Sequence, residues 1–256
     1  MRVDIPAALT RDPQPPTWVI PDMLPSGTLV ALAGDPGVGK SWFAYWLSVH
    51  VACGLPLLGQ PVPQGTVLYI DQENSLPDLS EYLRQIWHGL DCPPIVQIAQ
   101  CLIVNNFTLG LDWRTQMLAM AKQYQPSLIV VDTVTPACNI ADENDNAEAS
   151  RVITHLRTVR EAAGSQCCLL VLRHARLHFD QAGETPKRSM RGAKAWHGAM
   201  DQVLFHIRTT GGRTSRLTLR QTRIEPDKVR AWGLKDTWVL TPEVHDLGVA
   251  LRLSIG

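Results

Sequence analysis

The sequence predicts an α/β fold in which a mainly parallel sheet is covered by helices on both faces. Three observations support this fold class. Short apolar runs recur along the chain, segments with helical spacing separate them, and a glycine-rich loop joins the first run to the first helix. Strands buried on both faces read as continuous apolar runs, and their alternation with helices is typical of a parallel sheet. The 256 residues fit one domain with a full hydrophobic core.

The chain opens with a proline-rich segment. Residues 11–27 hold five prolines, so we expect an extended lead-in over residues 1–27 and a single domain over residues 28–256. Thr28–Ala33 ("TLVALA") is a short apolar run that ends before a glycine, which predicts a buried strand. The residues from Ser41 onward, "SWFAYWLSVHVAC", predict a buried helix.

The same patterns continue along the chain. The expected strands are Thr66–Asp71, "PPIVQIA", "CLIVNN", Ser127–Asp132 and Cys167–His174, and the expected helices are Leu76–Leu90, Asp112–Tyr124 and Asn146–Ala163. From Asp201 onward, four short runs alternate with turns: "QVLFHI", "SRLTLRQ", "TWVLTP" and "VALRLS". We expect these late strands to extend the sheet in antiparallel fashion.

The composition is that of an ordinary globular protein, with 45% hydrophobic and 19% charged residues. No apolar run reaches the roughly 20 residues that a membrane span needs, and residues 1–10 lack the order of a signal peptide. We therefore expect a cytoplasmic protein without a membrane partner. The six cysteines include no C-x-x-C pair, so the sequence contains no zinc-binding motif of that kind.

Charge is unevenly distributed although the net charge is zero. Residues 1–150 hold 6 Lys and Arg against 15 Asp and Glu, whereas residues 151–256 hold 18 against 9. Such asymmetry favours a nucleic-acid partner or head-to-tail self-association. The alternative is that the fold mixes both halves on every face.

A phosphate-binding pattern, G-x-x-x-x-G-K-[ST], lies in "GDPGVGKSW". Glycines let the backbone curl so that its N–H groups face phosphates, and the helix that follows adds the positive end of its dipole. Lys40 is expected to reach the β- and γ-phosphates, and the Ser41 hydroxyl to bind Mg²⁺. The expected nucleotide contacts are Gly34, Asp35, Pro36, Gly37, Val38, Gly39, Lys40, Ser41 and Trp42.

Carboxylates follow two other predicted strands. Asp132 ends the run "LIVVD", where we expect it to bind Mg²⁺ through water. "YIDQEN" places Asp71 within a strand and Glu73 just beyond it, at the sheet edge where ligands bind in open α/β folds. Hydrolysis needs a group that orients or deprotonates the attacking water, and Glu73 is the better placed of the two.

Taken together, "GTLVALAGDPGVGKS", "VLYIDQEN", "LIVVDT", "LRH" and "RGAKAW" resemble, in this order, the RecA-like ATPases of the RepA/DnaB hexameric-helicase group. The resemblance covers about Leu24 to Ile224 and is closest to the stand-alone RepA type. It implies a RecA-like P-loop core, ATP and Mg²⁺ as ligands, a head-to-tail hexameric ring and single-stranded DNA as a partner.

The resemblance also implies roles for single residues. Glu73 matches the family's catalytic glutamate, and Arg84 matches an arginine often found after it, which places Arg84 at the nucleotide. His174 matches a polar sensor of the γ-phosphate at the end of a strand. The family usually has two histidines there, whereas this chain has Arg173 before His174.

Two later segments match parts of the family's ring. The stretch "ARLHFDQAGETPKRSMRGAKAW" corresponds to a loop that lines the central channel, and the implied phosphate contacts of nucleic acid are Lys187, Arg188, Arg191 and Lys194. "LTLRQTRIEP" resembles the segment that donates a K-x-R pair to the neighbouring subunit. Arg223 matches the arginine, an arginine finger, and Gln221 stands in place of the lysine.

The resulting hypothesis is a ring-forming ATPase of the RepA helicase type that acts in plasmid, phage or mobile-element replication. An alternative is a regulatory or assembly ATPase that uses ATP to control oligomerisation and a protein partner. A metabolic kinase is a weaker third candidate, because the sequence shows no clear arginine-rich lid.

Overall fold

The computed structural model describes residues 5–6, 16–90, 102–105, 109–178, 187–190, 192, 194–208, 222–228, 236–244 and 248–255. Its main feature is one large sheet with the strand order β12-β11-β10-β9-β3-β7-β6-β4-β5. The strands are β3 (Leu29–Gly34), β4 (Val67–Asp71), β5 (Leu102–Asn105), β6 (Leu128–Asp132), β7 (Cys168–His178), β9 (Gln202–Arg208), β10 (Thr222–Lys228), β11 (Trp238–Val244) and β12 (Val249–Ile255).

Strand directions confirm the predicted fold class. From β9 through β3, β7, β6 and β4 to β5, every neighbouring pair is parallel. From β9 outward, β10, β11 and β12 pair in antiparallel fashion, as we expected for the late strands. The expectation is wrong for the first late strand, "QVLFHI" in β9, which pairs with β3 in parallel. In this order β7 separates β3 from β6, so the phosphate-loop strand and the Asp132 strand are not direct neighbours.

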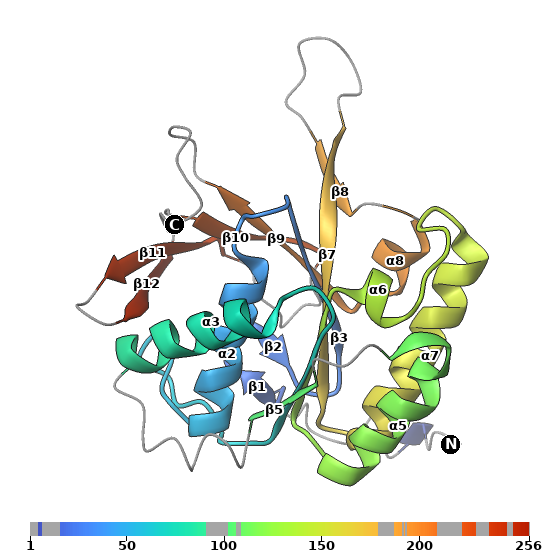
Figure 1. The fold of residues 1–256 in the computed structure, drawn as a ribbon, viewed down its shortest axis with the longest axis horizontal. Coiled ribbons are helices and arrows are strands. Elements are labelled where there is room, and N and C mark those ends of the chain that lie inside the picture. Colours follow the sequence, from blue (N-terminus) through green and yellow to red (C-terminus); the bar gives the residue numbers. More distant parts are fainter. Residues whose placement is uncertain are drawn as a thin grey trace.

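Helices cover both faces of the sheet, as Figure 1 shows. On one side lie α2 (Lys40–Cys53) and α3 (Leu76–Gly89), and on the other lie α5 (Trp113–Tyr124), α7 (Asn146–Ala163) and α8 (Lys194–Ala199). Two short helices, η1 (Gly110–Asp112) and α6 (Val134–Ala137), complete the described helices apart from a short turn at residues 5–6.

The core strands are apolar on both faces because both faces are covered. In β3, Val30 and Leu32 pack into the cluster on the α2 side, whereas Leu29, Ala31 and Ala33 pack into the cluster on the α7 side. Side chains alternate across a strand, so a continuous apolar run supplies two separate cores. This is why the sequence shows unbroken runs rather than strict alternation.

Local sequence features explain where the helices begin and end. The Ser75 side chain accepts a hydrogen bond from the Asp78 amide at the start of α3, and the Asp145 side chain accepts one from the Ala147 amide at the start of α7. Both are N-cap contacts of the usual kind. Gly54 ends α2 in the left-handed conformation that glycine adopts most easily.

Two segments differ from the sequence predictions. The described part of the lead-in contains a small antiparallel sheet, β1 (Trp18–Ile20) with β2 (Leu24–Pro25), and Ile20 and Leu24 are fully buried. In addition, β7 does not end at His174 but continues to His178, where it pairs with β8 (Lys187–Met190). The expected strands "PPIVQIA" and "SRLTLRQ" lie outside the described residues.

No helix in the described ranges is long and apolar enough to cross a membrane.

His50 generates a prediction about stability. Its ring is buried against Trp46, with ring centroids 4.2 Å apart, and its Nδ1 lies 3.1 Å from the Leu55 carbonyl oxygen. Burial lowers the pKa of His50 from 6.5 to about 4. Between pH 6.5 and about 4, His50 therefore binds a proton in the unfolded chain but stays neutral in the folded chain. Proton binding stabilises the unfolded state, so the unfolding free energy decreases as the pH falls through this range.

We predict that His50→Gln flattens the pH dependence of the unfolding free energy over this range. The change in slope should approach about 1.4 kcal/mol per pH unit, the value for one proton. The measurement is urea unfolding at several pH values, with His88→Gln, an exposed α3 histidine, as the control. Parallel curves for wild type and His50→Gln would show that His50 does not set this dependence.

Candidate functional site

The phosphate loop lies between β3 and α2, as the sequence predicts. β3 ends at Gly34 and α2 begins at Lys40, directly after Gly39. Gly37 and Gly39 have positive φ angles of 69° and 103°, which glycine adopts without strain. A Cβ atom on Gly34 would lie 2.5 Å from the His206 carbonyl oxygen, so the close approach of β9 also requires glycine there.

The Lys40 side chain folds back over this loop. Its Nζ donates hydrogen bonds of 3.1 Å to the carbonyl oxygens of Gly34 and Asp35, and the residue is buried. Burial lowers the pKa of Lys40, and the nearby carboxylates of Glu73, Asp132 and Asp35 oppose this shift. The ammonium group thus lies beside the loop amides, where an anionic phosphate would find its counter-charge.

Asp132 lies at the end of β6 and is completely buried. Its Oδ2 accepts a hydrogen bond of 2.8 Å from the Tyr69 hydroxyl. Burial raises the pKa of Asp132 to about 7, and the nearby hydroxyls of Ser41 and Tyr69 act in the opposite direction. The peptide bond from Asp132 to Thr133 is cis.

The donor set around Asp132 fits a magnesium ion. Its Oδ1 is buried and has no hydrogen-bond partner within the described part of the chain. A buried carboxylate oxygen without a donor beside a serine hydroxyl is the oxygen-only environment that Mg²⁺ prefers. Ser41 and Asp132 could therefore hold the ion, as the sequence predicts. No group of three or more His, Cys, Asp or Glu that could by itself hold a metal ion occurs among the residues with described positions.

Asp71 and Glu73, the two candidates for the base, have different environments. Asp71 is fully buried, and its Oδ1 accepts hydrogen bonds from the Glu73 amide at 3.1 Å and from the Asn74 amide at 2.9 Å. Its Oδ2 accepts one of 2.7 Å from the Tyr45 hydroxyl. Asp71 thus holds the segment after β4 that contains Glu73 and Asn74, whereas the Glu73 side chain itself is exposed. The geometry favours Glu73 as the group that meets water.

His174 lies within β7, level with Gly34 of β3 in the parallel register. Leu170 and Leu172 of the same strand belong to the cluster on the α2 side, and His174 shares their face because side chains alternate. The expectation that His174 ends the strand is wrong, because β7 gains a further antiparallel partner, β8, beyond it. Its expected side of the sheet, next to the phosphate loop, is consistent with the register.

Arg173 lies on the opposite face and cannot replace a second histidine at the phosphate loop. It is buried, with its guanidinium carbon 4.1 Å from the centre of the Trp196 ring. Burial lowers the pKa of Arg173 to about 10, although the Glu143 carboxylate opposes the shift. Arg173 therefore joins β7 to α8.

Sequence reasoning missed His206. It lies on β9, also level with Gly34, so the phosphate-loop strand has a histidine beside its last residue on each side. The His206 ring packs 5.5 Å from the Phe43 ring, centroid to centroid. Burial and the nearby Lys40 lower the pKa of His206 to about 3. Only the strand register reveals this residue, since it stands in a run that reads as an ordinary strand.

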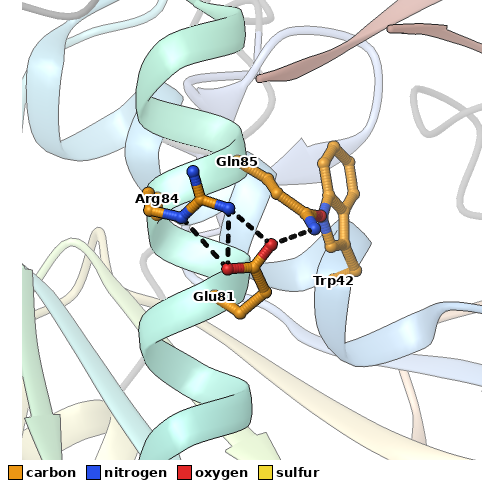
Figure 2. Close-up of polar contacts among 4 residues, drawn as sticks. All are labelled: Trp42, Glu81, Arg84 and Gln85. Carbon is orange, nitrogen blue, oxygen red and sulfur yellow. Dashed lines mark hydrogen bonds and ion pairs between the residues drawn. The ribbon is translucent and has the colours of Figure 1, made fainter. Parts of the chain in front are cut away.

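Arg84 and Trp42 are connected through α3, as Figure 2 shows. The Arg84 guanidinium donates to Glu81 at 2.9–3.0 Å, Gln85 donates to Glu81 at 2.6 Å, and the Trp42 indole donates to Gln85 at 3.3 Å. Trp42 is buried and Arg84 is exposed. This chain of contacts joins α3 to the first turn of α2.

The late candidate residues lie away from the phosphate loop in the sheet order. Arg223 is in β10, with Ile207 and Val239 as its register partners, and β9 separates β10 from β3. Lys187 and Arg188 are in β8, opposite His178 and Leu177. Lys194 is exposed at the start of α8, and Arg191 lies outside the described residues.

The segment that we expected to be a loop is therefore partly a β-hairpin. The strands β7 and β8 project beyond the rest of the sheet in Figure 1. The antiparallel pairing of residues 175–178 with Lys187–Met190 forms this projecting part, which we call the β7–β8 arm.

Comparisons with known proteins agree with this architecture. A family model described as an AAA domain (AAA_25) matches residues 2–177. No curated protein matches the chain. Among solved structures, the crystal structure of the RadB recombinase is similar, with a TM-score of 0.58 and 16% sequence identity over 88% of this chain and 91% of that chain. At this identity the likeness shows a shared RecA-like fold.

The site geometry predicts that substitutions of Lys40 and Glu73 impair different steps, nucleotide binding for Lys40 and hydrolysis for Glu73. Lys40→Ala removes the cation beside the loop and should abolish nucleotide turnover together with tight binding. Glu73→Gln removes the exposed carboxylate and should retain nucleotide binding but lower the hydrolysis rate by about 10²–10⁴-fold, the range for loss of a general base. Phosphate release and binding of a fluorescent ATP analogue measure the two effects.

Lys122→Ala, which removes an exposed α5 lysine, serves as the control and should leave both quantities unchanged. Full turnover by Glu73→Gln would remove that residue from the reaction.

Proposed function

Since the chain belongs to the AAA domain family and has the RecA-like fold of a P-loop ATPase, we propose that it is a ring-forming ATP hydrolase of the RepA helicase type that moves along single-stranded DNA. The observation that carries the hydrolytic part is the meeting of three groups at one edge of the sheet. The first is Lys40, which folds back over the phosphate loop. The second is Asp132, whose buried Oδ1 has no hydrogen-bond partner among the described residues. The third is the segment after β4 that carries Glu73 and is hydrogen-bonded to Asp71.

Each group has a distinct role in the proposed hydrolysis. The loop amides and Lys40 bind the β- and γ-phosphates, and Glu73 orients the attacking water and accepts its proton. Mg²⁺, held by Ser41 and Asp132, would supply charge neutralisation at the phosphates. His174 reports the state of the γ-phosphate from β7, because that strand continues from the nucleotide site into the β7–β8 arm.

The β7–β8 arm supports the proposal of a DNA partner. It joins the strand beside the phosphate loop to a basic segment that contains Lys187, Arg188 and Lys194. Lysine and arginine contacts to phosphates give affinity without sequence specificity, as movement along a strand requires.

The position of Arg223 and the charge distribution support the proposal of a ring. Arg223 lies on β10, two strands from the phosphate loop, so we propose that it completes the nucleotide site of a neighbouring subunit. Such head-to-tail contacts close into rings or run into filaments. The basic late half of one chain would then face the acidic early half of the next.

We predict that the chain binds labelled single-stranded DNA in fluorescence anisotropy, more tightly with a non-hydrolysable ATP analogue and more weakly as salt rises. The double variant Lys187→Ala/Arg188→Ala should weaken this binding about tenfold and reduce the slope of log affinity against log salt by about two, since each lost phosphate contact removes roughly one.

The control is Lys122→Ala/Arg151→Ala, which removes the same charge from exposed helix positions. Binding that is absent, or equal in the two double variants, would refute the DNA-bound motor and favour an ATPase that regulates oligomerisation and a protein partner.

A further inference from the structure

Two buried tyrosines lie between the two buried carboxylates of the site. Asp71 and Asp132 end the neighbouring strands β4 and β6 and are register partners. The Tyr45 hydroxyl donates to Asp71 at 2.7 Å, and the Tyr69 hydroxyl donates to Asp132 at 2.8 Å. The two rings are stacked, with centroids 3.8 Å apart and planes at 5°.

Each tyrosine hydroxyl binds one oxygen of its carboxylate. The Tyr69 hydroxyl binds Oδ2 of Asp132, which leaves Oδ1 without a hydrogen-bond partner among the described residues. The Tyr45 hydroxyl binds Oδ2 of Asp71, Oδ1 accepts the backbone amides of Glu73 and Asn74, and the Asn74 side-chain amide donates to both oxygens at 3.0–3.1 Å. The Tyr69 bond thus restricts rotation of the Asp132 carboxylate, and the Tyr45 bond ties Asp71 and the segment hydrogen-bonded to it to α2.

Tyr45 and Tyr69 are fully buried, and burial together with the adjacent aspartates raises the pKa of each. Tyr45 also lies on α2, the helix that begins with Lys40 and Ser41, so the pair connects this helix to β4 and β6.

We infer that Tyr69 and Tyr45 are positioning residues for the two halves of the site: Tyr69 aims the open oxygen of Asp132 at the metal position, and Tyr45 holds, through Asp71, the loop that carries Glu73. The stacked rings keep the two carboxylates in a fixed mutual arrangement. This inference rests on the proposed ATP hydrolysis. It assigns the orientation of the metal ligand to the Tyr69 hydroxyl and the placement of the Glu73 segment to the Tyr45 hydroxyl.

Packing alone gives a different expectation. Phenylalanine preserves the stacked ring and its buried area, so a purely structural role would leave both Tyr→Phe variants like wild type or equally destabilised. A positioning role instead makes the two variants fail differently. Tyr82 provides the control, because its ring lies 6.4 Å from the Tyr45 ring and its hydroxyl bonds neither carboxylate within the described residues.

The test of Tyr69 is the affinity of a fluorescent non-hydrolysable ATP analogue, titrated with Mg²⁺. Tyr69→Phe should raise the Mg²⁺ concentration at the midpoint about 10-fold or more, the usual effect of losing a residue that orients a metal ligand. Affinity without Mg²⁺ should be unchanged. Tyr45→Phe and Tyr82→Phe should keep the wild-type midpoint.

The test of Tyr45 is amide hydrogen exchange in residues 72–75 together with single-turnover hydrolysis. Tyr45→Phe should speed exchange at Glu73 and Asn74 and lower the hydrolysis rate about 10-fold at saturating Mg²⁺. Tyr69→Phe and Tyr82→Phe should leave this exchange unchanged. Circular dichroism verifies the fold of each variant, and the two variants are judged independently if one does not fold.

The outcomes separate this inference from the proposed function. If wild type binds the analogue but does not hydrolyse ATP, the proposed function fails, and the Mg²⁺ midpoint and the exchange still test the positioning roles. If wild type hydrolyses ATP and both Phe variants match Tyr82→Phe in midpoint and exchange, the positioning roles are overturned. Equal changes in both quantities for both variants would overturn them as well.

Discussion

The burial of two carboxylates side by side is the constraint on which the site depends. Asp71 and Asp132 end adjacent parallel strands and are both inaccessible to solvent. A buried carboxylate is strongly unfavourable unless donors or cations compensate it. Asp71 receives its compensation from backbone amides and Tyr45, whereas Asp132 has one oxygen without a donor in the described chain and a raised pKa. This difference is why Asp71 holds a loop and Asp132 suits a cation.

The strand order converts this constraint into a nucleotide site. Because β7 lies between β3 and β6, one strand separates the phosphate loop from Asp132, and α2 spans this interval with Lys40 and Ser41 in its first turn. The same register places His174 and His206 level with Gly34 on either side. Continuation of β7 into the β7–β8 arm then links the site to the basic segment at Lys187.

Local sequence patterns predicted the parts of the fold that depend on local chemistry. The helix Asn146–Ala163 has the predicted bounds, because Asp145 caps its start and Gly164 follows its end. The glycine, lysine and serine positions of the phosphate loop were also predicted from the sequence. Features that depend on pairing between distant segments were not predicted. They include His206, the β7–β8 arm and the tyrosine pair. Their roles arise from strand register and from contacts across the core.

We infer that these buried carboxylates form one half of a magnesium-dependent nucleotide site. The most direct measurement is thermal unfolding of the wild-type chain with a non-hydrolysable ATP analogue, in Mg²⁺ and in a chelator. A ligand at a hundredfold excess over its Kd stabilises the folded state by about 2.7 kcal/mol, or roughly 5–10 °C in Tm for a chain of this size. We expect such a rise with analogue and Mg²⁺ together and a much smaller one in the chelator. Equal Tm values in the two conditions would contradict a magnesium-dependent site.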